Sequence, residues 1–411
     1  MTVLKDLINK RFNKIEKRNY FGYPLLDDAF SAEDINSAME VLLSKKITMG
    51  EITNEFEHEF ANYIGSKYAL MVNSGSSANL LAAFALVNPL KKNHLNIGDE
   101  FLIQSLCWST SLWPMVQAGL RPKFIDVNTR TLNIEPEEFY RSITKKTKAA
   151  MIVHVLGNCS DIDLITKIGK KKNLYLIEDT CESLGSMFKN KYLGTFGSFG
   201  TFSFYYSHQI TSGEGGMIIC DNKKDYQIIH SMRAHGWDRG LNKRKNNLKD
   251  FNFINAGFNL RPLDITAAIG LSQFKRLNNF KKTRNENKKK ILNSLQNSKN
   301  WNNQFSFIEK NKNLKPSWFG LPMLIDKKYL HKKEKFLNFL NEQKVETRPI
   351  ISGNFLDQPS IKLFNLNKKN KIMRNSKEIS DRGFFIGLHT KPIYQNQINK
   401  LTKLLLSIDE I

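Results

Sequence analysis

Short apolar runs alternate with longer segments of helical periodicity through the first two thirds of the chain. The runs lie at Tyr68–Val72, Phe101–Gln104, Lys123–Asp126, Ala150–Val155 and Leu174–Ile177. Runs of this kind, separated by segments long enough for a crossover helix, are typical of buried parallel strands. Two further runs, Thr201–Tyr205 and Gly216–Asp221, can complete the same sheet. The pattern predicts an α/β fold with a mostly parallel sheet of seven strands.

A different pattern follows once this alternation ends near Gln273. We predict a helix, a strand, a helix, a strand and a final helix at Phe280–Leu295, Trp318–Ile325, Tyr329–Gln343, Phe384–Gly387 and Gln395–Ile408. This mixture indicates a smaller C-terminal α+β domain. A length of 411 residues also favours more than one domain. We therefore expect an N-terminal arm at 1–35, a large domain at 36–275 and a small domain at 276–411.

The N-terminal arm carries apolar residues at helical spacing, namely Leu4, Leu7, Ile8, Phe12 and Ile15. They predict a short amphipathic helix that packs against the body or a partner subunit, with a membrane surface as the alternative. The arm lacks the apolar core of a signal peptide, because Lys5 and Asp6 directly follow Leu4. No run reaches the roughly 18 apolar residues that a membrane span needs. We expect a cytoplasmic protein without a membrane partner.

Four cysteines, Cys107, Cys159, Cys181 and Cys220, are far apart and form no Cys-x-x-Cys pair. Their spacing suggests neither a zinc site nor an iron–sulfur cluster, so no metal is expected. So few cysteines also argue against a disulfide scaffold and agree with a reducing cytoplasm.

The net charge of +23 raises the question of nucleic-acid binding. Much of the excess lies in lysine- and asparagine-rich stretches such as Lys288–Lys290 and Lys368–Lys371, without interleaved aromatic residues. Such stretches are usually solvated faces. We therefore expect no nucleic-acid partner, and a basic field that attracts a phosphate-bearing substrate.

A turn rich in serine and glycine, Asn73–Asn79, follows the first predicted strand. An apolar helical stretch comes next, which places Gly75, Ser76 and Ser77 at a helix N-terminus. Such a terminus attracts a phosphate dianion, and the hydroxyl of Ser203 is expected near the same anion. An ordinary N-cap is the alternative, because Ser-Gly-Ser turns often serve that purpose alone.

Three side chains follow the ends of predicted strands. Asp179 ends the fifth strand, at the sheet edge where ligands usually bind; it can pair with a protonated pyridine nitrogen or simply cap a turn. Trp108 follows the second strand and can lie against the face of such a ring or pack in the core. Glu182 can hydrogen-bond a phenolic oxygen of the same ligand or begin a helix.

A histidine occupies an informative position in the segment Ser203–His208, which reads Ser-Phe-Tyr-Tyr-Ser-His and precedes Gly213–Gly216. With the serine turn, Trp108 and Asp179, this segment resembles the DegT/DnrJ/EryC1/StrS family of sugar aminotransferases over nearly the whole chain. The resemblance implies a fold type I enzyme that uses pyridoxal 5'-phosphate or pyridoxamine 5'-phosphate. In that family a lysine binds the cofactor covalently at the position of His208. Imidazole cannot form this bond, but it can transfer protons near neutral pH.

The resemblance narrows to a branch that removes the C3 hydroxyl of GDP-4-keto-6-deoxy-D-mannose. The histidine itself, the segment Asp179–Ser183 and the segment Arg233–Trp237 carry this narrower match. It implies a 3-dehydratase with His208 as the base and L-glutamate as the donor that regenerates the cofactor amine. No residue of the sequence separates GDP from CDP, UDP or dTDP.

Further residues take roles from the resemblance alone. Asn259, in a segment similar to the family's Gly-Tyr-Asn-x-Arg, is expected to reach the cofactor phosphate of a neighbouring subunit, which implies a homodimer. Arg348 lies in a turn that faces substrate in the family. His235 and Arg239 belong to a polar loop suited to sugar or phosphate contacts, although a solvated loop is the alternative.

Two other functions remain open at this stage. A CDP-sugar 3-dehydrase of the reductive type also has histidine here, but it binds an iron–sulfur cluster through cysteines, and the segment Asp238–Asn259 contains none. A non-catalytic protein that holds the cofactor and binds sugar nucleotides is the second. A binding pocket needs no partner for the ring nitrogen, so the presence of Asp179 beside His208 favours catalysis.

Overall fold

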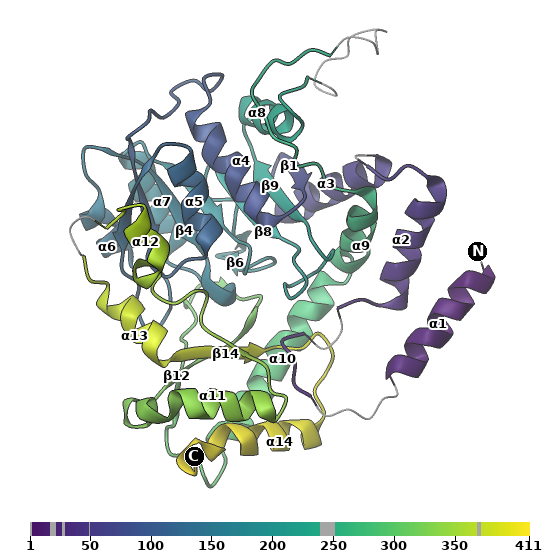
Figure 1. Ribbon diagram of the computed structural model, residues 1–411, viewed down its shortest axis with the longest axis vertical. Helices are drawn as coiled ribbons and strands as arrows, with labels where there is room; N and C mark the ends of the chain where they lie inside the picture. The colour runs from purple at the N-terminus through teal and green to yellow at the C-terminus, as the bar shows by residue number, and fades with distance from the viewer. Residues whose placement is uncertain (1, 17–21, 27–28, 49, 239–250, 368–370) are drawn as a thin grey trace.

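A computed structural model describes residues 2–16, 22–26, 29–48, 50–238, 251–367 and 371–411 of the chain. Figure 1 shows a large sheet with covering helices above, and a smaller sheet beside the helices α10, α11 and α14 below. The smaller body has a buried apolar core of its own, and the core of the large sheet continues into residues of the smaller body such as Phe319 and Phe385. None of the described helices combines the length and the apolar character that crossing a membrane requires.

The large sheet has seven strands in the order β1-β9-β8-β5-β4-β2-β3. Their bounds are Tyr68–Val72 for β1, Glu100–Gln104 for β2, Arg121–Ile125 for β3, Thr147–Val153 for β4, Tyr175–Asp179 for β5, Phe199–Ser203 for β8 and Gly216–Cys220 for β9. Only β9 runs antiparallel to its neighbours, β1 and β8. The predicted, mostly parallel seven-stranded sheet is therefore confirmed.

Helices cover both faces of this sheet (Figure 1). They are α2 (Ala32–Ser44), α3 (Glu51–Ile64), α4 (Gly75–Val87), α5 (Ser109–Gln117), α6 (Pro136–Ser142), α7 (Ile162–Lys171), α8 (Lys223–Arg233) and α9 (Asp264–Phe274), with a short 3-10 turn η1 at Val155–Gly157. The helix α4 is apolar on nearly every side, because it packs on β8 and β9 and against α5 and α8. This enclosure fixes the N-terminus of α4 at the sheet edge.

The smaller body is built on an antiparallel sheet in the order β10-β12-β14-β13. Its strands are Phe305–Phe307 (β10), Gly320–Ile325 (β12), Thr347–Arg348 (β13) and Gly383–Gly387 (β14). The accompanying helices are α10 (Leu277–Gln296), α11 (Lys333–Glu342), α12 (Pro359–Leu363), α13 (Arg374–Arg382) and α14 (Gln395–Leu406), with 3-10 turns η2 (Lys327–Lys332), η3 (Phe355–Asp357) and η4 (Ser407–Asp409). A third, short sheet joins β11 (Leu314–Lys315) to β6 (Met187–Phe188) and β7 (Lys191–Tyr192).

Two predicted elements of this body begin later than expected. The strand predicted from Trp318 starts at Gly320, and the carbonyls of Trp318 and Phe319 accept hydrogen bonds from the buried Arg284 rather than from a neighbouring strand. The helix predicted from Tyr329 starts as the 3-10 turn η2 and becomes α-helical only at Lys333.

The N-terminal segment divides between the two bodies. The helix α1 (Thr2–Glu16) lies along α2, where Lys5 Nζ donates to Glu40 Oε1 at 2.7 Å. Tyr23, farther along, donates its N–H to the Lys344 carbonyl at 2.8 Å, and its ring stacks on His389 with centroids 4.3 Å apart. Part of the predicted arm therefore packs into the smaller body, in agreement with the expected packing against the body of the protein.

Candidate functional site

A cavity of about 590 Å³ lies at the carboxyl ends of the parallel strands. The large body supplies most of its wall, and Arg348, Ile351, Phe319 and Phe385 enter from the smaller one. This is the edge at which open α/β sheets bind ligands. The cavity brings together eight of the predicted site residues, namely Gly75, Ser76, Trp108, Asp179, Glu182, Ser203, His208 and Arg348.

The serine turn caps α4 at one end of this cavity. The hydroxyl of Ser74 accepts the N–H of Ser77 at 3.1 Å, so the helix begins at Gly75. A Cβ atom on Gly75 would lie 2.6 Å from the Cβ of Ser203, which no real pair of carbon atoms tolerates. Glycine therefore keeps the helix terminus against Ser203, and the free amide donors there form a concave site suited to an anion.

Ser77 lies behind this turn. Its N–H caps the helix, its hydroxyl donates to Asn73 Oδ1 at 2.6 Å, and it is not among the described residues that line the cavity. The expected direct contact of Ser77 with a phosphate therefore has no support in the geometry. Ser76 does line the cavity, and its hydroxyl donates to Thr110 Oγ1 at 3.0 Å.

Asp179 is buried at the end of β5, with 4% of its surface exposed. Its Oδ2 accepts hydrogen bonds from Asn79 Nδ2 at 2.8 Å and from Ser111 Oγ at 2.7 Å, while Oδ1 accepts the N–H of Cys181 at 3.2 Å. These donors fix the carboxylate, which also lines the cavity. Sequence reasoning missed Asn79 and Ser111. The signal for Asn79 was a polar residue among the apolar residues of α4.

Glu182 lies on the cavity wall three residues beyond Asp179. Its Oε2 accepts the N–H of Leu156 at 2.9 Å. Burial, which disfavours the charged form, and the nearby Asp179 carboxylate together raise the pKa of Glu182 to about 7, although the hydrogen bond from Leu156 opposes them. Near neutral pH this carboxyl is therefore divided between a protonated form that donates a hydrogen bond and an ionised form that accepts one.

His208 reaches the cavity from the loop that follows β8. Its ring packs edge-on against Phe319, with centroids 5.0 Å apart, and its Nδ1 is buried without a hydrogen-bond partner among the described residues. Burial, together with the positive charge of Arg284, lowers the pKa of His208 to about 3. The imidazole is therefore a neutral base in the protein without ligand.

Trp108 and Arg348 line the cavity from different bodies of the molecule. Trp108 precedes α5 with 56% of its surface exposed, so it lines the cavity instead of packing in the core. Arg348 stands on β13, where its Nη2 forms an ion pair with Glu346 Oε1 at 2.6 Å. An aromatic face and a cation are thus both available at the cavity wall.

The remaining predicted residues lie elsewhere. Asn259 and His235 are exposed on neighbouring loops and are absent from the described lining of the cavity. Asn259 Oδ1 accepts a hydrogen bond from Arg261 Nε at 2.9 Å, and His235, with a left-handed φ of 63°, donates its N–H to the Phe258 carbonyl. Arg239 falls outside the described residues.

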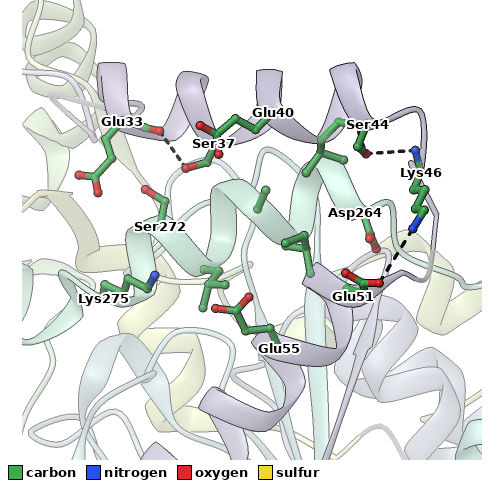
Figure 2. A pocket seen from close by; sticks show the side chains of 14 residues that line it. Glu33, Ser37, Glu40, Ser44, Lys46, Glu51, Glu55, Asp264, Ser272 and Lys275 are labelled. Atoms are coloured by element: carbon green, nitrogen blue, oxygen red, sulfur yellow. Dashed lines mark hydrogen bonds and ion pairs between the residues drawn. The ribbon is translucent and has the colours of Figure 1, made fainter. Parts of the chain in front are cut away.

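A second hollow of about 390 Å³ lies between α2, α3 and α9, as Figure 2 shows. Its wall includes five carboxylates, those of Glu33, Glu40, Glu51, Glu55 and Asp264, beside serine, lysine and apolar side chains. It contains none of the predicted site residues. Within the parts of the chain that the structure describes, no group of three or more histidine, cysteine, aspartate or glutamate residues is arranged to hold a metal ion.

The main cavity fits a pyridoxal phosphate. It offers an anion site at the N-terminus of α4, a fixed carboxylate for a pyridinium nitrogen at Asp179, a titratable partner for a phenolic oxygen at Glu182 and an aromatic face at Trp108. Among the described residues that line it, none is a lysine. The covalent attachment usual for this cofactor therefore has no candidate in the cavity wall.

Comparisons with known proteins agree with this geometry. The model of the DegT/DnrJ/EryC1/StrS aminotransferase family matches residues 28–403. The chain is 38% identical over 395 residues to GDP-4-keto-6-deoxy-D-mannose 3-dehydratase of Escherichia coli O55:H7, covering 93% of this chain and 99% of that protein. The solved E. coli enzyme of that name with bound hydrated PLP superimposes with a TM-score of 0.85 and 36% identity, covering 94% of this chain and all of that one. A structure of the same enzyme with a trapped PLP-glutamate geminal diamine gives a TM-score of 0.84 at 36% identity, over 93% of this chain and all of that one.

Proposed function

Because the chain belongs to the DegT/DnrJ/EryC1/StrS aminotransferase family, we propose that it is a 3-dehydratase that depends on pyridoxal and pyridoxamine phosphate. Its substrate is a nucleotide-linked 4-keto-6-deoxy sugar, GDP-4-keto-6-deoxy-D-mannose by similarity to its relatives. L-Glutamate regenerates the cofactor amine, in keeping with the glutamate adduct of the related enzyme. The reaction serves deoxysugar biosynthesis.

One observation carries this proposal. His208 stands on the cavity wall where the aminotransferases of the family have a lysine. None of the described residues that line this wall is a lysine. A lysine amine binds the cofactor and returns a proton to the substrate, whereas an imidazole can only exchange protons. The site is therefore equipped for elimination and lacks the group that completes an amine transfer to sugar.

Six residues would hold the cofactor in this chain. The amides of Gly75 and Ser76, at the N-terminus of α4, and the hydroxyl of Ser203 would bind its phosphate. Asp179 would keep the ring nitrogen protonated, and Trp108 would cover a face of the ring. Glu182 would hydrogen-bond the phenolic oxygen. When bound, the cofactor supplies an amine for the sugar's C4 carbonyl and a ring that accepts an electron pair.

His208 would then move the proton. As the neutral imidazole, His208 would accept a proton from a carbon atom of the bound cofactor. As the imidazolium it would donate that proton to the C3 hydroxyl of the sugar, which leaves as water. Burial and the charge of Arg284 favour rapid loss of the proton once it has been taken up. One side chain therefore acts first as base and then as acid. Hydrolysis of the product finally releases a 3-deoxy-4-keto sugar and ammonia.

Substrate contacts are proposed for Arg348, His235 and Arg239. Arg348 is the cation of the cavity wall and suits a carboxylate or a phosphate. His235 and Asn259 are not in the described lining of their own chain's cavity, so we propose that they serve the site of a second subunit; Arg239 lies outside the described residues. This arrangement requires a homodimer. The described protein has only free cysteines, in keeping with a cytoplasmic location.

A direct assay tests the proposal. The purified protein is supplied with pyridoxal phosphate, glutamate and, in separate reactions, GDP-, CDP-, UDP- and dTDP-linked 4-keto-6-deoxy sugars. Mass spectrometry is expected to show loss of the C3 oxygen from the GDP sugar. Release of an amino sugar that retains the C3 oxygen would show an aminotransferase instead. Binding without turnover of any sugar would favour a non-catalytic binding protein.

Cofactor attachment gives a second test. Without a lysine in the cavity wall, the protein is expected to lose its cofactor on prolonged dialysis. Borohydride treatment should leave no pyridoxyl group on the chain. A reduced adduct on a lysine peptide, found by mass spectrometry, would contradict the role given to His208. Retained activity after anaerobic iron chelation, without any reductase, would separate this protein from the reductive CDP-sugar class.

A further inference from the structure

Arg284 is a fully buried arginine, with 1% of its surface exposed, on the helix α10 that links the two bodies. It is not among the described residues that line the cavity, so it does not touch a ligand there. A buried guanidinium is costly unless its donors are used, and its position therefore needs an explanation.

Hydrogen bonds from Arg284 join the loop of His208 to the segment that precedes β12. Its Nη2 donates to the carbonyl of His208 at 3.1 Å, and its Nη1 donates to the carbonyls of Trp318 and Phe319 at 3.3 and 3.4 Å. Phe319 is also the ring against which the imidazole packs edge-on. The planar guanidinium of Arg284 therefore holds both the backbone of His208 and that of Phe319, whose ring orients the imidazole.

We propose that Arg284 is a positioning residue for the elimination, because its hydrogen bonds hold the His208 loop against the smaller body and so orient the imidazole. The inference rests on the role proposed for His208. The guanidinium acts on that side chain in two ways, through the geometry of the loop and through its charge. Its charge also makes the imidazolium a stronger acid, and so speeds the return of the proton to the leaving hydroxyl.

Other titratable or charged groups share the cavity with the imidazole. Asp179 ends β5 and Glu182 follows it, Tyr205 belongs to the His208 loop, Glu214 precedes β9, and Arg348 stands on β13. Of these and Arg284, the guanidinium is the group whose charge, after burial, lowers the pKa of His208. Removal of the guanidinium is therefore expected to act on the imidazole more than any change at the cavity wall.

The test uses NMR titration of the cofactor-free full chain with labelled histidine, in which the His208 signal is the one lost in His208→Asn. In Arg284→Met, which removes the charge at similar volume, the pKa of His208 is expected to rise by about 1 unit or more toward 6.5. His230, whose pKa is lowered to about 4 by burial and by Arg233, is the internal reference and should not move. An unchanged His208 titration in a folded Arg284→Met protein overturns the proposal.

Two further variants separate charge from geometry. Arg284→Lys keeps a cation but offers fewer and less directed donors, so the low pKa should persist while kcat for dehydration falls by about 10- to 100-fold. Wild-type kcat in this variant overturns the positioning role. Lys281→Met removes another cation of α10, which donates to the Gly185 carbonyl at 2.7 Å, and should leave both measurements unchanged.

If Arg284→Met does not fold, Arg284→Lys with its kcat and its His208 titration decides the question. The titrations need neither substrate nor cofactor. They therefore succeed or fail independently of the dehydratase assay, and a failure of the proposed function is distinguishable from a failure of this inference.

Discussion

At the end of β5, each face of the sheet has a buried carboxylate near a histidine. Only one of these two pairs lines a cavity, whereas the other is enclosed by the protein. Glu178 and Asp179 are consecutive, so their side chains point to opposite faces. On the core face, Glu178 pairs with His154, and both are fully buried. On the cavity face, Asp179 lies in the same cavity wall as His208.

The core set is closed by the protein itself. Glu178 Oε2 accepts His154 Nε2 at 3.0 Å and the N–H of Gly194 at 2.8 Å. Its Oε1 accepts the N–H groups of Phe196 and Gly197 at 2.6 and 2.7 Å. Four donors thus surround one carboxylate, and no part of it is left for a ligand. Such an arrangement stabilises the turn at 194–197.

The cavity set has unused capacity. Asp179 Oδ1 accepts the N–H of Cys181 at 3.2 Å while the carboxylate lines the cavity, and the imidazole of His208 contacts aromatic rings. The difference teaches that burial and residue type do not mark a catalytic group. What marks it is the hydrogen-bonding capacity that the protein leaves unfilled at a cavity.

The largest effect on the rate is expected from a comparison of two single variants, in which His208 or His154 is replaced by asparagine. His208→Asn should lower the rate of dehydration by about 100- to 10,000-fold, because the proton carrier is lost, with little change in Tm. His154→Asn should lower Tm and leave the activity of the folded fraction unchanged. Steady-state kinetics and calorimetry on both variants measure this contrast. Wild-type dehydration by His208→Asn would show that this imidazole is not the base.

A smaller effect on rate is expected at the open carboxylate. Asp179→Asn removes the charge opposite the ring nitrogen and should reduce kcat by about 100- to 1,000-fold. Asn79 and Ser111 can still hydrogen-bond the new amide, so the fold should persist. The absorbance spectrum of the bound cofactor should change with protonation of the ring. An unaltered spectrum together with an unaltered rate would refute the pairing.

The closed carboxylate should respond in stability instead of rate. In Glu178→Gln, the amide NH₂ is a hydrogen-bond donor that faces backbone N–H donors, so these groups lose their acceptor. We expect this change to lower the free energy of unfolding by about 3 kcal/mol. Urea denaturation measures this loss. The kcat of the protein that remains folded should match the wild type. A fall in kcat as large as that of Asp179→Asn would contradict the assignment of Glu178 to stability and of Asp179 to the reaction.

The smallest effect concerns Glu182 and pH. Its pKa rises from 4.5 in the unfolded chain to about 7 in the folded, cofactor-free protein, so the folded state binds the proton more tightly. Between these values the free energy of unfolding therefore falls as pH rises, by on the order of 3 kcal/mol from this group. The stability of the wild type relative to Glu182→Gln should decline from pH 5 to pH 8. A difference that is independent of pH would contradict the raised pKa.

Much of the site was accessible from the sequence because its residues follow strand ends. Apolar periodicity placed the seven strands within a few residues, and parallel strands end at one edge, so Asp179, Glu182 and Trp108 had to meet there. The serine turn was equally readable, because glycine and serine at a helix start are local signals. The histidine at position 208 was identified by its resemblance to the family's lysine segment.

Other residues depended on contacts between distant parts of the chain. Asn79 and Ser111 come from the helices α4 and α5, and although Asn79 is a polar residue in an apolar helix, no local pattern shows that either side chain meets Asp179. Arg284 looked like one more charge in a lysine-rich helix. Composition cannot show that one cation of such a helix is buried.

The sequence alone thus determined which elements form and which side chains stand at the ends of the strands, because the periodicity of strands and helices is local. Only the tertiary structure decided which carboxylate is closed and which is open. Glu178 and Asp179 are adjacent acids of similar chemistry, and their fates differ because folding brings four donors to the first and a cavity to the second. That distinction depends on which distant backbone groups arrive, and no local pattern contains it.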